Sequence, residues 1–250
     1  EDGIRDKQIC LVGSEMCIRD RLVTTIRALK LHGGKDKTRL EEPDTDAVRG
    51  GLENLDKHIE TSGQFNKKPV VVLNRFAADT DEEIAIVAER VAKHELAFAE
   101  SRHFMEGGPG SADFARAVVA AAEETTELDF AYDMEMSLHD KVKGVARRCY
   151  GADDVIFSKE AEKDLKQITA AGLEKLPICI AKTPASLSDD PTVLGRPRDF
   201  DITVRNVQVS AGAGFLVVLT GAILRMPGLP KKPQALKVRL NEDGTVDGIA

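Results

Sequence analysis

The sequence predicts an α/β protein with a mostly parallel, buried sheet, flanking helices and a C-terminal region of antiparallel or mixed strands. The first observation is a proline followed by VVVL at 70–73, which is typical of a strand buried on both faces. A short loop and an amphipathic helix follow this strand, and the same order recurs from Phe98. Beyond residue 200 apolar and polar residues alternate, as they do in strands with one exposed face.

The segments between residues 22 and 68 predict a strand, a loop and a helix. LVTTIRALKLHGG at 22–34 opens with apolar and β-branched residues and stops at Gly-Gly, so we expect a strand running into a turn or helix. Residues 35–51 are rich in charge and turn formers, which predicts a surface loop. Leu52, Leu55 and Ile59 recur at intervals of three and four, which predicts an amphipathic helix.

The middle of the chain predicts two strand–loop–helix units and two further helices. PVVVLNRF at 69–76 is followed by a helix with Asp79 or Thr80 as its N-cap and acidic residues in its first turn. A strand near Phe98 leads through the HFMEGGPGS loop to a helix over 112–124. The next helix should end at Gly151, a natural C-cap, and residues 160–172 predict another.

The C-terminal quarter predicts short strands. LPICIAK at 176–182 indicates a buried strand, and DITVRNVQVS at 201–210 alternates until its phase slips after Val204. GFLVVLTGAIL at 214–224 is the next expected strand. The chain should close with a hairpin at Glu242–Asp243–Gly244.

The first 21 residues differ from the rest because EDGIRDKQICLVGSEMCIRDR has neither helical nor strand periodicity. Part of this stretch resembles translated sequencing-adapter read-through, so we expect a non-native extension. The alternative is a natural but unusual N-terminal strand. We expect residues 22–175 to form an α/β domain that carries the site, and residues 176–250 to form the mixed strand region.

Composition excludes several classes of function. The 250 residues carry a formal net charge of -7, which argues against a nucleic-acid or anionic-membrane surface. No apolar run approaches the ~20 residues that a membrane span needs. The four cysteines form no CxxC pair and no histidines cluster, so we expect no metal site and a reduced, cytoplasmic location.

Two aromatic residues follow neighbouring strands at the edge where ligands of open α/β sheets bind. Asn74, Arg75 and Phe76 come directly after VVVL, and Phe104 follows the next strand, before Gly107 and Gly108. Two such rings could clamp a flat ring, and Arg75 could pair with a carboxylate or phosphate. The alternative for Phe76 is a ring that only caps the core.

A third candidate loop, residues 181–200, also follows a buried strand and is dense in hydrogen-bonding side chains. Its candidate residues are Lys182, Ser188, Asp189, Asp190, Gly195, Arg196 and Pro197. This loop suits a polar ligand such as a nucleotide, and a solvated loop with Asp-Pro turn chemistry is the equal alternative. The phosphate-binding motif GxxxxGK[ST] does not occur in the sequence.

From about Leu22 to its end the chain resembles formate–tetrahydrofolate ligase. The resemblance rests on PVVVLNRFAADTDEEI, SLSDDP, LGRP followed by TVR, and MPGLPK, in that order. It implies an enzyme of one-carbon metabolism that joins formate to tetrahydrofolate at the expense of ATP, through formyl phosphate. Phe76 matches the family's phenylalanine that stacks on folate, with Asn74, Arg75, Gly107 and Gly108 beside it. Phe104 stands where the family usually has a tryptophan, so we expect weaker folate binding.

The resemblance also implies what this chain does alone. The LSDDP and LGRP region is similar to the part that lines the nucleotide end of the family's site. The family's P-loop belongs to a half N-terminal to this region, so we expect a fragment of a larger P-loop-type ligase. That fragment should have no catalytic residue and be inactive alone, with ATP and Mg bound mainly by the missing half. The intact enzyme should be a homo-oligomer. The alternatives are a stand-alone folate- or nucleotide-binding module and a non-catalytic assembly subunit.

Overall fold

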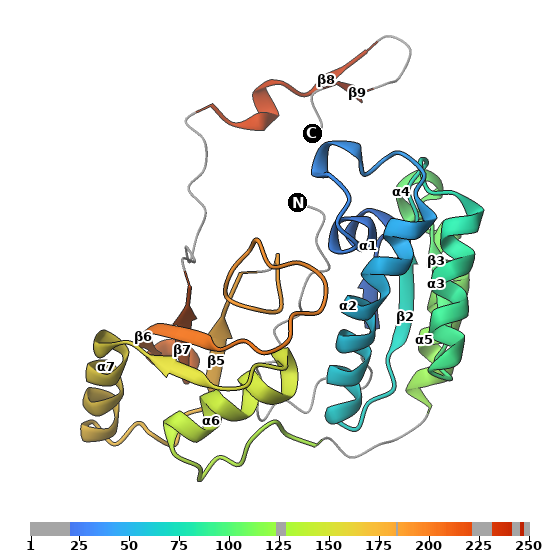
Figure 1. Ribbon diagram of the computed structural model, residues 1–250. Helices are drawn as coiled ribbons and strands as arrows, with labels where there is room; N and C mark the ends of the chain where they lie inside the picture. The colour runs from blue at the N-terminus through green and yellow to red at the C-terminus, as the bar shows by residue number, and fades with distance from the viewer. Residues whose placement is uncertain (1–20, 124–128, 184, 222–231, 242–245, 248–250) are drawn as a thin grey trace.

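The first sheet of the computed structural model is parallel, as expected, and lies in the N-terminal part of the chain (Figure 1). The structure describes residues 21–123, 129–183, 185–221, 232–241 and 246–247. Its first sheet has the order β1 (Arg21–Thr24), β2 (Val70–Asn74) and β3 (Phe98–Ser101), all parallel. Four consecutive residues of β2 are buried, which agrees with its unbroken apolar sequence.

Helices flank this sheet. They are α1 (Ile26–His32), α2 (Thr45–Gln64), α3 (Asp81–Lys93), the short α4 (His103–Glu106) and α5 (Ala112–Ala122). One apolar core joins the sheet to the first three: Ile26, Leu29, Val48, Leu52, Leu55, Ile59, Val71, Leu73, Ile84, Ile86, Val87 and Val91. The strand–helix order expected from the sequence is therefore confirmed.

The expected loop over 35–51 is wrong in its second half, because α2 already begins at Thr45. Asp44 caps this helix by accepting a hydrogen bond from the Ala47 amide at 2.9 Å. The second Gly-Gly pair lies inside the helix rather than at a turn. A Cβ on Gly51 would stand 2.0 Å from the carbonyl oxygen of Leu29. Glycine therefore serves here to let α1 and α2 pack backbone to backbone.

A buried ion pair joins α1 to α3, and its carboxylate also binds the backbone at the start of α2. Lys30 Nζ lies 2.7 Å from Glu83 Oε1, and both side chains are almost fully buried. Glu83 also accepts hydrogen bonds from the backbone amides of Asp44 and Thr80. Thr80 in turn accepts from the Glu83 amide, so α3 starts with a complete capping box. These contacts fix the starts of α2 and α3 relative to α1.

The second sheet is mixed and has the order β4-β6-β7-β5. Its strands are β4 (Val155–Phe157), β5 (Ile178–Ala181), β6 (Ile202–Ser210) and β7 (Phe215–Thr220). The β4–β6 and β5–β7 pairs are parallel, whereas β6 and β7 are antiparallel. The register shifts between Val204 and Asn206, where the alternation of the sequence slips. The expected mixed strand region is thus confirmed, with β4 as an additional strand.

Helices α6 (Leu138–Val145) and α7 (Lys159–Ala170) belong with this sheet (Figure 1). The π-helical turn Ala146–Tyr150 continues α6 and ends at Gly151, which takes the left-handed conformation expected of a C-cap. A second apolar core, which includes Val142 of α6, Leu165 of α7 and Ile180 of β5, also contains Phe65. Phe65 follows α2, so this helix spans from one core to the other.

The remaining described elements are short. The 3₁₀ turns are Lys37–Arg39, Pro109–Ser111, Ala211–Ala213 and Gln234–Leu236. Strands β8 (Arg239–Leu240) and β9 (Val246–Asp247) form an antiparallel pair. The turn expected at 242–244 lies outside the described residues.

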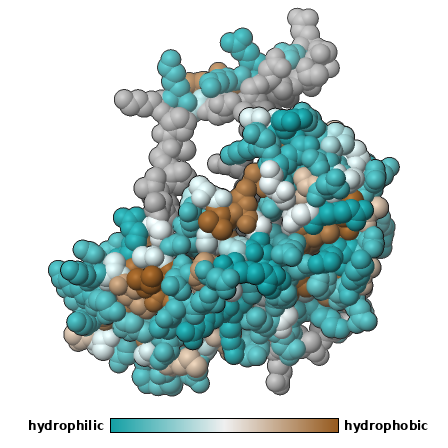
Figure 2. All heavy atoms as spheres, viewed as in Figure 1, coloured by the Kyte–Doolittle hydropathy of each residue, from teal (hydrophilic) through white to brown (hydrophobic). Residues whose placement is uncertain are grey.

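The surface in Figure 2 is mainly hydrophilic, with separate apolar patches. Among the described helices, none combines the length and the apolar character that crossing a bilayer requires. The domain boundary at 175/176 stays a prediction. β4 lies before it and pairs with β6 of the second sheet.

Candidate functional site

Two phenylalanine rings meet at the carboxyl end of the first sheet. Phe76 follows β2 by two residues, and Phe104 follows β3 by three. Their ring centroids are 6.3 Å apart and the ring planes are tilted by 47°. The structure therefore brings together the two rings that the sequence placed at neighbouring strand ends. We call Phe76 and Phe104 the ring pair.

Phe76 is held from both sides. Its amide donates to Asp79 Oδ2 at 2.8 Å, and the Asp79 amide donates to the Phe76 carbonyl at 3.1 Å. The Arg27 guanidinium carbon lies 4.8 Å from the centroid of the Phe76 ring, within cation–π range. Arg27 is itself bound to Glu41 at 2.7 Å. The Phe76 backbone is thus fixed by Asp79, and its ring is in contact with Arg27.

Asp79 is the buried acid of this turn. Burial raises the pKa of its carboxyl group, and the bond to the Phe76 amide partly offsets that effect. Sequence reasoning considered Asp79 only as an N-cap, a role that Thr80 takes. It also missed Arg27, because the position of this side chain over Phe76 depends on how α1 packs.

Phe104 is the exposed wall. Its side chain is 73% exposed, and it stands on the four-residue helix α4. That helix ends at Gly107, whose φ of +64° favours glycine. Gly108 follows, and the loop closes where the Arg102 amide donates to the Gly110 carbonyl at 2.8 Å. The glycines therefore form the turn that carries the ring.

Arg75 and Asn74 differ in whether their side chains have partners within the protein. The Arg75 guanidinium binds Asp81 at 2.6 Å and Glu100 at 3.1 Å, so two carboxylates of the chain already occupy it. Asn74 Oδ1 is buried and has no hydrogen-bond partner among the described residues. Asn74 therefore retains hydrogen-bonding capacity beside the ring pair.

The 181–200 loop is held mainly by its own side chains. Lys182 is buried, donates to the carbonyls of Thr183 and Ser186, and lies 5.0 Å from the Tyr150 ring centroid. Ser188 bonds to Ser186 Oγ and to the Asp190 backbone.

The two aspartates of this loop also accept backbone hydrogen bonds. Asp189 accepts from the Thr203 amide at 2.9 Å, and Asp190 accepts from the amide and hydroxyl of Thr192. The ammonium and carboxylate groups expected near a nucleotide thus serve the loop in this structure. Their proximity to a nucleotide stays a prediction.

The LGRP part of the loop contacts helices α1 and α2. The Gly195 amide donates to His32 Nδ1 at 3.0 Å, and Asn54 donates to the Gly195 carbonyl at 2.7 Å. Arg196 forms two hydrogen bonds with Glu60, at 2.8 and 2.7 Å. Burial lowers the pKa of His32 to about 4, and the neighbouring His58 adds to this effect. His32 is therefore neutral and accepts the Gly195 hydrogen bond.

The sequence-predicted residues thus form two groups. Phe76, Phe104, Asn74, Arg75, Gly107 and Gly108 lie together at the end of the first sheet, and Pro197 lies half-buried with Gly195 and Arg196 at the docked loop. In the described part of the chain, no hydrogen bond or ion pair joins the loop to the ring pair. Also among these residues, no group of three His, Cys, Asp or Glu side chains is placed to hold a metal ion.

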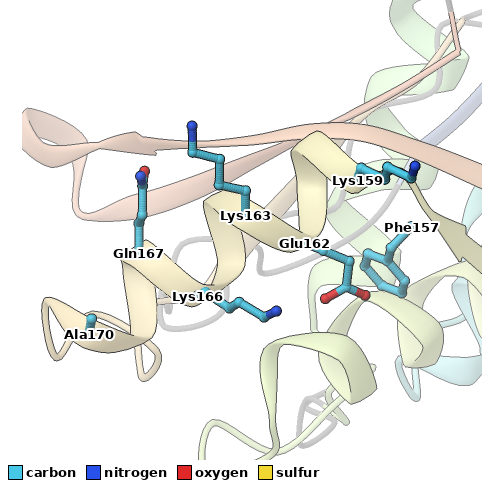
Figure 3. Close-up of a pocket in the computed structure, with 7 residues that line it drawn as sticks. All are labelled: Phe157, Lys159, Glu162, Lys163, Lys166, Gln167 and Ala170. Carbon is cyan, nitrogen blue, oxygen red and sulfur yellow. The ribbon is translucent and has the colours of Figure 1, made fainter.

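A separate hollow of about 540 Å³ lies beside α7, and Figure 3 shows its lining. Its residues are Phe157, Lys159, Glu162, Lys163, Lys166, Gln167 and Ala170. Lys163 and Gln167 point away from Phe157 and Glu162, so the polar groups of the lining do not all converge on one point. None of the predicted site residues lines this hollow, and we assign it no ligand.

Residues 15–250 match the family model described as formate–tetrahydrofolate ligase. The match starts within the segment expected to be a non-native extension, and β1 begins at Arg21, the last residue of that segment. The origin of residues 1–21 stays a prediction.

Proposed function

The chain belongs to the formate–tetrahydrofolate ligase family, and we propose that it carries the surface on which tetrahydrofolate stacks in that enzyme. The observation that supports this most is the ring pair at the carboxyl end of the first sheet. A reduced pterin is flat enough to lie between two aromatic walls, which bind it through area and edge or face contacts.

The geometry of the ring pair also indicates how the pterin ring enters between the two phenylalanines. Two stacking distances of ~3.5 Å each add to ~7 Å between the outer rings. The rings stand 6.3 Å apart and are tilted, so one of them must turn outward by a small amount. Phe104 is the ring that can turn, since it is exposed on a short helix, whereas Asp79 and Arg27 hold Phe76. Phenylalanine offers less area than tryptophan, which supports weaker stacking at this wall.

Formate and ATP are the other proposed substrates, on the basis of the family. We propose that the 181–200 loop forms the nucleotide-facing edge without binding phosphate itself, because its ammonium and carboxylate groups already have partners. Magnesium-bound ATP would then need the family's P-loop, a motif that these 250 residues do not include. Phosphoryl transfer depends on such a cradle for positioning and charge stabilisation. The 250-residue chain should therefore form no 10-formyltetrahydrofolate alone, and the active enzyme should be a cytoplasmic homo-oligomer.

Isothermal titration calorimetry with tetrahydrofolate tests the folate proposal. The 250-residue chain should bind, and Phe76→Ala should weaken binding roughly 10-fold or more, because a stacking wall is lost. Phe130→Ala is the matched control, since Phe130 is also partly exposed but lies outside the site. Equal affinity of the parent chain and Phe76→Ala, or no binding by the folded parent chain, would contradict the proposal.

A further inference from the structure

The carboxamide oxygen of Asn74 is a buried acceptor without an assigned role in the fold. Asn74 is the last residue of β2, and its Oδ1 has no hydrogen-bond partner among the described residues. Buried acceptors are nearly always paired in folded proteins, because an unpaired one carries a free-energy penalty. The side chain as a whole is only half-buried. Such a group at a strand end is a candidate for pairing with a ligand.

The register of the sheet places this carboxamide on the side of the ring pair. Asn74 lies opposite Ser101 of β3, and the ladder continues one step further, with the Arg75 amide donating to the Ser101 carbonyl at 3.0 Å. The backbone is therefore still extended at Arg75, and side chains two residues apart in extended chain point to the same side. Asn74 and Phe76 thus share one side of the chain.

The neighbouring polar side chains are already bound within the protein. Arg75 lies between Asp81 and Glu100, and Asp79 accepts the hydrogen bond of the Phe76 amide. Asn74 Oδ1 accepts no such bond from the residues that the structure describes. Its last torsion is broad and roughly two-fold, so the carboxamide can turn toward a ligand without breaking a hydrogen bond.

The chemistry of a carboxamide matches one edge of a pterin. The ring nitrogen N3–H and the adjacent carbonyl C4=O form a cis-amide that presents one donor and one acceptor. An asparagine side chain has one acceptor oxygen and an NH₂ donor in the complementary arrangement. Asparagine pairs in this two-bond manner with base edges in nucleic-acid complexes.

We propose that Asn74 recognises the N3–H/C4=O edge of the pterin ring that stacks on Phe76. This inference rests on the proposed function, and it makes Asn74 a specificity-determining residue for pterins over other flat rings. Phe76 supplies contact area that any flat ring could use. Asn74 supplies the hydrogen bonds that select the heterocycle.

The test measures tetrahydrofolate affinity and thermal stability on the 250-residue chain and on two variants. Asn74→Leu keeps the side-chain size and removes both hydrogen-bonding groups. Thr24→Val is the matched control, because Thr24 Oγ1 is the other unpaired buried oxygen at a strand end of this sheet. Thr24 lies opposite Leu73 and projects from the same face of the sheet, into the core. Asn74 projects from the opposite face, because it follows Leu73 in β2.

Asn74→Leu should weaken tetrahydrofolate binding about 10-fold or more, as expected for a lost two-bond pair. Its thermal midpoint should stay the same or rise, since the free protein loses an unpaired buried acceptor. Thr24→Val should leave the affinity unchanged. Probe ligands sharpen the result: 6-methyltetrahydropterin should lose affinity with Asn74→Leu, and p-aminobenzoylglutamate, which has no pterin, should not.

Tetrahydrofolate binding by Asn74→Leu at the parent affinity overturns the inference, and the proposed function stands if Phe76→Ala still loses binding. A fall of the thermal midpoint together with the affinity also overturns it, because Asn74 then has a structural role. No binding by the folded parent chain overturns the proposed function and this inference together.

Discussion

Acidification should lower the free energy of unfolding through His32. The neutral ring of His32 accepts the Gly195 hydrogen bond that joins the 181–200 loop to α1. The pKa of His32 falls from 6.5 to about 4 in the folded chain, mainly through burial. Between these pKa values the unfolded chain binds a proton that the folded chain does not. The stability contributed by the neutral His32 ring is therefore fully present above the unfolded pKa. It is lost as the pH falls toward the folded pKa.

The size of this effect follows from the difference between the two pKa values of His32. A drop in the pKa from 6.5 to about 4 changes the free energy of unfolding by at most ~3 kcal/mol. Of this, ~2 kcal/mol should be lost between pH 7 and pH 5. Partial exposure of the ring reduces the effect further, so ~1 to 2 kcal/mol is the expected range.

Urea unfolding at pH 7 and pH 5 measures this loss on the parent chain and on His32→Asn. The asparagine oxygen can accept the Gly195 hydrogen bond in place of Nδ1, but it does not titrate. The variant should therefore lose ~1 to 2 kcal/mol less on acidification than the parent chain. Carboxylates that titrate in this window contribute equally to both proteins and cancel. An identical pH dependence of the two proteins would show that His32 does not cause the loss, as would an NMR titration that places the His32 pKa near 6.5.

Three further pairs of variants test the helix packing, the buried ion pair and the support of the ring pair. Gly51→Ala should lower the free energy of unfolding by about 3 kcal/mol, because its Cβ would stand 2.0 Å from a carbonyl oxygen of α1. Gly63→Ala, in an open position of the same helix, should raise it by about 0.5 kcal/mol, and equal effects in urea unfolding would contradict the packing. Lys30→Met should cost ~3–5 kcal/mol because it leaves the Glu83 carboxylate buried without its cation, and the Lys30→Met/Glu83→Gln double variant should cost less. Asp79→Ala should weaken tetrahydrofolate binding about 5-fold in calorimetry, whereas Asp79→Asn, which keeps the acceptor, should stay close to the parent chain.

Much of the first unit follows from local sequence. The VVVL run predicts a doubly buried strand, and the threonine and glutamate at 80 and 83 form the capping box that starts α3. The two site phenylalanines could be found because parallel strands end at one edge, so residues that follow them become neighbours.

Contacts between distant segments were not predictable. Gly50 and Gly51 look like a turn in sequence, and their role is visible only when α1 packs against α2. The partners of Arg75 and the position of Arg27 likewise depend on segments far along the chain or on helix packing. The docking of Gly195 on His32 joins residues 163 positions apart, which no local pattern encodes.

A fluorescence titration can test directly whether a folate ring lies between Phe76 and Phe104. The chain contains no tryptophan, so Phe104→Trp introduces a single reporter at the exposed wall. Titration with tetrahydrofolate should quench its emission in a saturable way, beyond the quenching of free N-acetyltryptophanamide. In the same background, Phe76→Ala should shift the midpoint of the saturable part to a roughly 10-fold or more higher tetrahydrofolate concentration. Heat of binding in calorimetry without any change in the emission of this tryptophan would show that folate binds elsewhere and would contradict the account.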